Sequence, residues 1–126
     1  MTDSTDHNRW LERANQDLKM LNIINKEGLE GMEDSFCYIT HQAAEKLLKA
    51  FIVKNERSIL KSHDLVFLLG KCIKYKSTLV KLTDVITILN EYAVSARYPD
   101  DFGDKRTLGD AMEAYHCIKE VELLFL

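Results

Sequence analysis

The chain has 126 residues, 46% hydrophobic and 29% charged, with a net charge of −3. These figures are typical of one globular domain, residues 1–126, and they exclude a disordered chain. The low number of turn-forming residues, one proline and five glycines, argues against a β-rich fold. The slightly negative net charge gives no overall attraction to nucleic acid, although a local basic patch is still compatible with it.

The chain shows no sign of a membrane segment or a secretion signal. No run of 18 residues is apolar enough to span a bilayer, and the polar N-terminus lacks the hydrophobic stretch of a signal peptide. The three cysteines, Cys37, Cys72 and Cys117, fall within apolar helical patterns. An odd number of such cysteines favours reduced, buried thiols, so we expect a cytoplasmic protein.

Apolar residues recur at helical spacing in five segments. Residues 7–26 form the first predicted helix, with Asp6 as N-cap, and glycines at 28 and 31 end it. Residues 35–55 form the second, capped by Asp34 or Ser35. Its small residues allow a neighbouring helix to approach closely: Ala43, Ala44 and Ala50.

Three further helices complete the prediction. Residues 63–75 form a short helix after Ser62 as N-cap, and residues 77–97 form a longer one that Pro99 ends. The last begins at Thr107, whose spacing to Asp110 is that of a capping box with Asp in place of Glu. Short polar connections favour antiparallel neighbours, so we predict an all-α, antiparallel up-and-down bundle of four to five helices.

Arg97 is the first candidate for a binding residue. Counting back at helical spacing gives apolar positions, which places Arg97 on the inward face of its predicted helix: Ala93, Leu89, Ile86 and Leu82. A buried guanidinium needs a partner or a groove, and Tyr98, Asp100 and Asp101 follow directly. The functional interpretation is an arginine that grips phosphate or RNA. The structural alternative is a helix-end arginine that complements the helix dipole.

His63 and Asp64 fall in the first turn of the third predicted helix. A helix N-terminus can bind an anion, with His63 as a titratable neighbour. Alternatively, Asp64 complements the helix dipole and His63 packs on the loop.

His41 and Glu45 lie one turn apart on the second predicted helix and can act as an acid–base pair. We favour the alternative that they face solvent or an interface, where Gln42 and Lys46 would hydrogen-bond across a dimer seam. Glu45 and Lys49 are expected to form an ion pair on the helix flank, worth a few tenths of a kcal/mol.

Other groups of polar residues carry weaker signals. Cys37 with His41, and His116 with Cys117, have suitable ligand types but no supporting carboxylate or paired-cysteine pattern, so we predict no metal site. No cofactor motif is present. Four lysines are expected to form a solvated face, with contacts to RNA phosphates as the alternative: Lys71, Lys74, Lys76 and Lys81.

Four phrases, taken in order, resemble the HEPN domain family. They are RWLERA with DL at residues 9–14 and 17–18, HQAAEKLLKA at 41–50, SHDL at 62–65, and YAV with ARYPD at 92–94 and 96–100. The resemblance covers almost the whole chain. It implies an antiparallel helical bundle, a homodimer, and a partnership with a minimal nucleotidyltransferase in a two-component toxin–antitoxin pair.

Ribonuclease members of that family use an arginine and a following histidine, brought together across the dimer. Arg97 matches the arginine, and the histidine would fall at positions occupied here by Phe102, Gly103 and Asp104. We therefore expect a nucleotide- or RNA-binding member in preference to an enzyme. The alternatives are an endoribonuclease toxin that uses His63 or His41 as its base, and a helical scaffold without a ligand.

Overall fold

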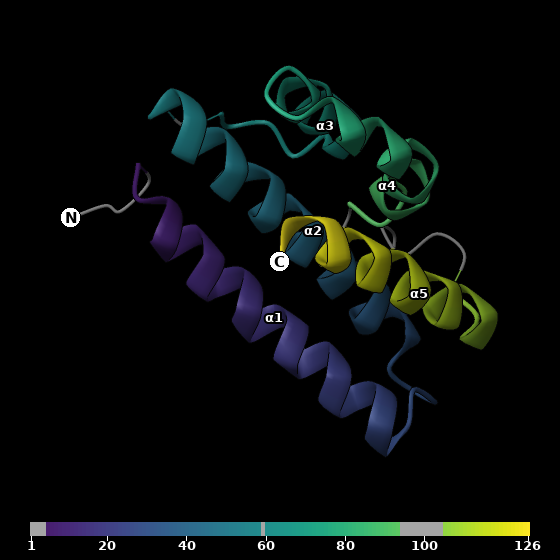
Figure 1. The fold of residues 1–126 in the computed structure, drawn as a ribbon. Helices are drawn as coiled ribbons and strands as arrows, with labels where there is room; N and C mark the ends of the chain where they lie inside the picture. Colours follow the sequence, from purple (N-terminus) through teal and green to yellow (C-terminus); the bar gives the residue numbers. More distant parts are fainter. Residues whose placement is uncertain (1–4, 59, 94–104) are drawn as a thin grey trace.

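A computed structural model describes residues 5–58, 60–93 and 105–126, and within these ranges the chain is helical with no strand (Figure 1). The elements are α1 (His7–Glu27), α2 (Glu33–Glu56), α3 (Leu65–Ile73), the 3₁₀ helix η1 (Ser77–Leu82), α4 (Thr83–Asn90) and α5 (Leu108–Phe125). The predicted all-α bundle is confirmed.

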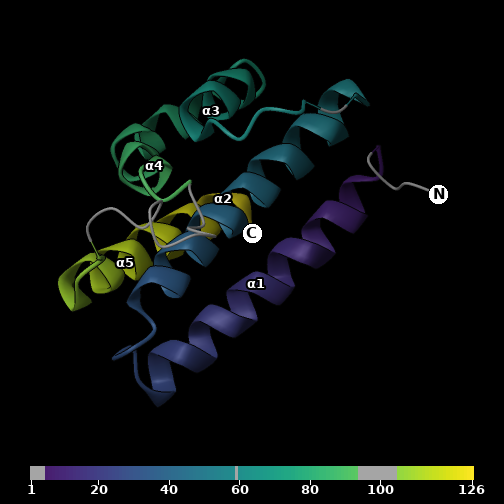
Figure 2. The same cartoon turned by 180° about the vertical axis from the view of Figure 1, so that it is seen from behind.

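Helix α2 is the central element of the bundle. It contacts α1, α3, α4 and α5, with α1 antiparallel along one side and the α3–η1–α4 layer on the other (Figures 1 and 2). Phe36 meets Tyr115 and Phe51 meets Phe125, so α5 follows α2 in the same direction. A helix with neighbours on several sides must be apolar around most of its circumference, which explains the wide apolar stripe of α2.

The start of α2 differs from the prediction. The helix begins at Glu33 after Met32, with no side-chain cap, so Asp34 and Ser35 lie inside its first turn. Asp34 Oδ1 instead accepts a hydrogen bond from the backbone N–H of Arg106 at 2.8 Å. The acidic side chains of Glu33 and Asp34 still complement the helix dipole at this end.

The cap of α3 is Asp64, and the prediction of Ser62 was wrong. Asp64 Oδ1 accepts from the N–H groups of Val66 and Phe67, at 3.0 and 3.3 Å. The Asn90 side chain at the end of α4 accepts from Leu65 N at 2.8 Å and donates to Asp64 Oδ1 at 3.1 Å. The start of α3 and the end of α4 are therefore joined by polar contacts.

The single helix predicted over residues 77–97 is also wrong. It is divided into η1 and α4, and α4 ends at Asn90. The carbonyl of Val80 accepts both the backbone N–H of Thr83 and, at 2.6 Å, its hydroxyl, so a tight turn with three-residue spacing persists at the junction. Ala93 is exposed and lies outside α4, so the helical count that placed Arg97 on an inward face no longer holds. Residues 94–104, with Arg97, lie outside the described ranges.

The capping box that begins α5 is confirmed. The Thr107 hydroxyl accepts from Asp110 N at 3.0 Å, and the Asp110 carboxylate accepts from Thr107 N at 2.8 Å. This end of α5 therefore satisfies its exposed amides locally, as the four-residue pattern predicts.

We predict that Asp64→Ala lowers the free energy of unfolding by about 1–2 kcal/mol, because two amides of α3 lose their acceptor. Ser62→Ala should cost distinctly less, since among the described residues the Ser62 hydroxyl accepts only from Asp64 N. Urea unfolding of both variants checks this. Equal losses, or a larger loss for Ser62→Ala, would return the capping role to Ser62.

Candidate functional site

Four polar side chains meet between α2 and the segment that leads into α3, and we call them the Glu45 cluster: His41, Glu45, Lys49 and His63. Glu45 Oε2 lies 2.9 Å from Lys49 Nζ and 2.9 Å from His63 Nδ1. Because a carboxylate can only accept, the His63 Nδ1–H donates. The cluster therefore places one acid between two cationic or potentially cationic groups.

Burial of the cluster overturns the solvent- or interface-facing interpretation of His41 and Glu45. His41 is 0% exposed, Glu45 5% and Lys49 4%. The Glu45–Lys49 pair is therefore a buried ion pair and not the expected flank contact. A buried pair differs in kind from an exposed one, because removal of either partner leaves an uncompensated charge in the core.

Lys49 also connects the cluster with α1. Its ammonium group lies 5.5 Å from the centre of the Trp10 ring. One helical turn away, Lys46 Nζ donates to Asp17 Oδ2 of the same chain at 2.6 Å. Lys46 is thus engaged within the chain by Asp17, and its hydrogen bond across a dimer seam stays a prediction.

His41 is a buried, neutral histidine. Its Nε2 lies 3.1 Å from the backbone carbonyl of His63, so Nε2 carries the hydrogen, and Nδ1 lies 3.4 Å from the Gln42 amide nitrogen. Burial is the largest effect on its pKa and lowers it from the ordinary 6.5, against the opposing charge of Glu45. This ring is committed to holding the His63 backbone and is screened from any external substrate.

His63 has the opposite character. Its side chain is 73% exposed, although Nδ1 is held by the buried carboxylate of Glu45. The ring is thus fixed from the inside, and its Nε2 edge is the part open to solvent. A histidine oriented by a carboxylate is a common arrangement for proton transfer or for contact with an anionic ligand.

The second oxygen of Glu45 has no hydrogen-bond partner among the described residues. His41 Nδ1 lies 3.9 Å from Oε1, which is beyond hydrogen-bond range. In the Nε2–H tautomer, Nδ1 has no hydrogen to offer. The carboxylate therefore keeps one acceptor position that neither Lys49 nor His63 fills.

Asp64 does not leave the N-terminus of α3 open. The amides of Leu65, Val66 and Phe67 already donate to Asn90 and Asp64. Of the two interpretations of the His63–Asp64 pair, this geometry matches the structural one for Asp64. His63, by contrast, contacts Glu45 instead of merely packing on the loop.

The sequence candidates Arg97, Tyr98, Asp100 and Asp101 lie outside the described residues. Arg106, just beyond this segment, lies 4.7 Å from the centre of the Tyr92 ring and donates to the Glu91 carbonyl at 3.2 Å. Arg106 was missed by sequence analysis, since no spacing links it to Tyr92. Its contacts bring the two flanks of residues 94–104 together beside the start of α2.

The cysteines are buried thiols. Burial raises the pKa of Cys37 and of Cys72 to about 12, and the Cys72 thiol faces the Leu48 carbonyl at 3.6 Å. Within the described part of the chain, no three His, Cys, Asp or Glu side chains are placed to hold a metal ion. These thiols behave as small apolar side chains.

A groove of about 280 Å³ lies on the other side of α2, between the N-terminal half of α1 and the end of α5. Its walls are mixed: apolar side chains such as Leu11, Leu47 and Phe51 line it together with the polar residues His7, Asn8 and Lys54. Nothing in the groove resembles the paired charges of the Glu45 cluster.

The comparisons with known proteins agree with this architecture. The sequence profile of the HEPN domain matches residues 7–125, and the chain belongs to the HEPN domain family. No curated protein and no solved structure matches the chain. None of the helices in the described ranges is long and apolar enough to cross a membrane.

We predict that the stability of the protein rises with pH through His41, in the range around and below the ordinary histidine pKa of 6.5. Its pKa is lower in the folded than in the unfolded chain, so the unfolded chain binds more protons in this range and folding is favoured as pH increases. In His41→Gln, which keeps a donor for the His63 carbonyl, the pH dependence of the unfolding free energy should flatten.

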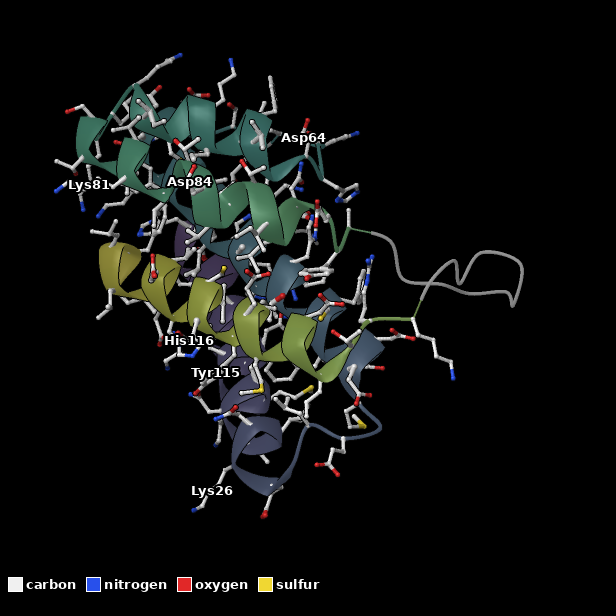
Figure 3. All side chains as sticks on the ribbon, turned by 90° about the vertical axis from the view of Figure 1, so that its right-hand side faces the viewer. Lys26, Asp64, Lys81, Asp84, Tyr115 and His116 are labelled. Carbon is white, nitrogen blue, oxygen red and sulfur yellow. The ribbon has the colours of Figure 1, made fainter. Side chains whose placement is uncertain are left out.

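His116→Gln is the matched control, because His116 is exposed on α5 (Figure 3). Urea unfolding across this pH range should give it the slope of the wild type. A wild-type slope in His41→Gln would show that a neutral, buried His41 is not the source of the pH dependence.

Proposed function

We propose that this HEPN domain protein binds nucleotide or RNA, acts as a homodimer, and forms a two-component toxin–antitoxin pair with a minimal nucleotidyltransferase. The observation that carries the proposal is a HEPN match over residues 7–125 in a chain that keeps Arg97 without a histidine at positions 102–104. In this proposal Arg97 is the group that contacts phosphate, and the histidine expected to accept a proton is absent.

The environment of His41 supports binding over catalysis. Its Nε2–H is engaged by the His63 carbonyl and its side chain is fully buried, so it is no substitute for the absent histidine. In this proposal Arg97 contacts phosphate, and Asp100 or Asp101 holds the guanidinium. Arg106 adds a second cation at the flank of the segment, beside the ring of Tyr92.

We predict that Arg97→Ala weakens binding of a labelled single-stranded RNA, or of ATP, by about tenfold or more, because a charge-assisted contact is lost. Fluorescence anisotropy or calorimetry measures the change. Arg13→Ala, which removes an exposed arginine from α1, is the charge-matched control and should bind as the wild type does. Equal affinity of wild type, Arg97→Ala and Arg13→Ala would remove Arg97 from the binding site.

The partnership needs a separate measurement. Co-expression with a minimal nucleotidyltransferase encoded beside this chain should give a complex that co-purifies, with a mass by light scattering that contains two copies of the HEPN chain. A HEPN chain that is monomeric and does not co-purify with the nucleotidyltransferase would contradict both the proposed homodimer and the proposed two-component pair.

A second candidate function is an endoribonuclease with His63 as its base, and the contact of His63 Nδ1 with Glu45 favours it. The carboxylate fixes the ring and leaves the Nε2 edge exposed, which suits proton abstraction. This candidate predicts RNA cleavage by the purified protein and growth arrest on expression, both lost in His63→Gln and in Arg97→Ala. Intact RNA after incubation with wild-type protein would end it.

A further inference from the structure

The charges of the chain are divided unevenly along its length. Residues 57–82 contain Arg57 and five lysines against Asp64 as the single acid, a formal charge of +5 in a chain whose total is −3. The remaining residues therefore carry −8. An asymmetry of this size within one small domain indicates a local surface for a polyanion, which the total charge conceals.

The outward side of α3 and the two residues that follow it combine this charge with exposed rings, and we call them the α3 face: Phe67, Gly70, Lys71, Lys74 and Tyr75. Phe67 is 46% exposed and Tyr75 42% exposed. The Lys71 ammonium lies 5.6 Å from the Phe67 ring centre, and the Lys74 ammonium lies 5.7 Å from that of Tyr75. Each exposed ring thus has a lysine ammonium group over one of its faces.

Gly70 is an independent observation on the same face. It lies in the middle of α3 and is exposed, and a Cβ added there would meet nothing within 4 Å. Glycine weakens a helix relative to alanine, and no neighbour in the described structure requires its small size. Gly70 lies one helical turn from Phe67 and one turn from Lys74, and its backbone is not covered by a side chain. A flat ligand could therefore approach the helix backbone closely between these two residues.

Two acidic groups next to the α3 face, Glu56 and Asp64, are already engaged. The Glu56 carboxylate accepts from the Tyr75 hydroxyl at 2.7 Å and lies 3.8 Å from Lys74 Nζ, so it fixes the ring at the edge of the face. Lys74 nevertheless keeps a side chain that is 59% exposed. Asp64, at the other end of α3, is used as the helix cap.

We propose that the α3 face binds single-stranded RNA, with bases stacked on Phe67 and Tyr75 and phosphates in contact with Lys71 and Lys74. The proposal deepens the proposed function and rests on its RNA-binding part, but uses residues other than Arg97. Exposed rings select a single strand over a duplex, because only unpaired bases offer their faces for stacking. Lysines beside the rings supply the phosphate contacts.

The test is fluorescence anisotropy with a labelled oligouridylate of about twelve nucleotides, a length within the usual range of single-strand sites. Phe67→Leu keeps the charge but removes the ring, and should weaken binding about tenfold. The double variant Lys71→Gln/Lys74→Gln should make the dependence of log affinity on log salt shallower by about 1.4, the value for two phosphate contacts on a single strand.

The matched control is Lys19→Gln/Lys26→Gln, the same change of charge on two exposed lysines of α1. Figure 3 shows Lys26 at the opposite end of the molecule from the α3–η1–α4 layer, which carries Lys81 and Asp64. This control should keep the salt dependence of the wild type. An equal change in both double variants would show that only the total charge matters and would overturn the α3 face.

Gly70→Ala separates binding from folding. The variant should raise the melting temperature, because alanine favours a helix, and should weaken RNA binding several-fold, because the added methyl group obstructs the approach to the backbone. Gly70→Ala with unchanged RNA affinity would contradict a ligand at this position.

Failure of this proposal can be told from failure of the proposed function. RNA binding that is lost in Arg97→Ala but unchanged in Phe67→Leu and in Lys71→Gln/Lys74→Gln overturns the α3 face and leaves the proposed function standing. The reverse pattern supports the α3 face and removes Arg97. Binding to phosphatidylserine vesicles without binding to the oligouridylate would overturn the α3 face as an RNA surface.

Discussion

A carboxylate in the centre of a helical bundle must be balanced by charge and hydrogen bonds, because an unpaired buried charge costs several kcal/mol. Glu45 meets this requirement at one oxygen, Oε2, which contacts Lys49 and His63, each at 2.9 Å. Lys49 in turn lies against the Trp10 ring of α1. One acidic side chain of α2 therefore connects α1 with the segment that leads into α3, next to the apolar core in which the α3–η1–α4 layer packs.

The same connection determines what the layer presents to solvent. The His63 backbone is held by His41 and its ring by Glu45, and the next residue, Asp64, caps α3. With its start fixed in this way, α3 buries Leu65, Leu68, Leu69 and Cys72 and exposes the lysines and rings of its outer side. The Glu45 cluster and the α3 face are thus joined directly, because His63 belongs to the cluster and α3 begins two residues later.

Sequence reasoning was most successful where local pattern decides the outcome. The periodicity of α1 and the spacing from Thr107 to Asp110 predicted α1 and the start of α5 closely. Sequence reasoning failed where contacts between residues far apart in the chain decide the local structure. Ser62 and Asp64 are both acceptable caps, and Asn90 of α4 favours the second. The spacing of His41 and Glu45 was recognised, but their burial depends on the approach of His63, which no local pattern encodes. The four residues from Arg97 to Asp101 singled out as ligand contacts remain a prediction from the sequence.

The most direct measurement of the central claim is a double-mutant cycle of Glu45→Met and Lys49→Met, followed by urea unfolding. A buried ion pair predicts that Lys49→Met alone costs about 3–5 kcal/mol, because Glu45 loses a main partner, and that the double variant is much less destabilised than the sum of the single changes. Additivity within about 0.5 kcal/mol, as for a solvent-screened pair, would contradict the account.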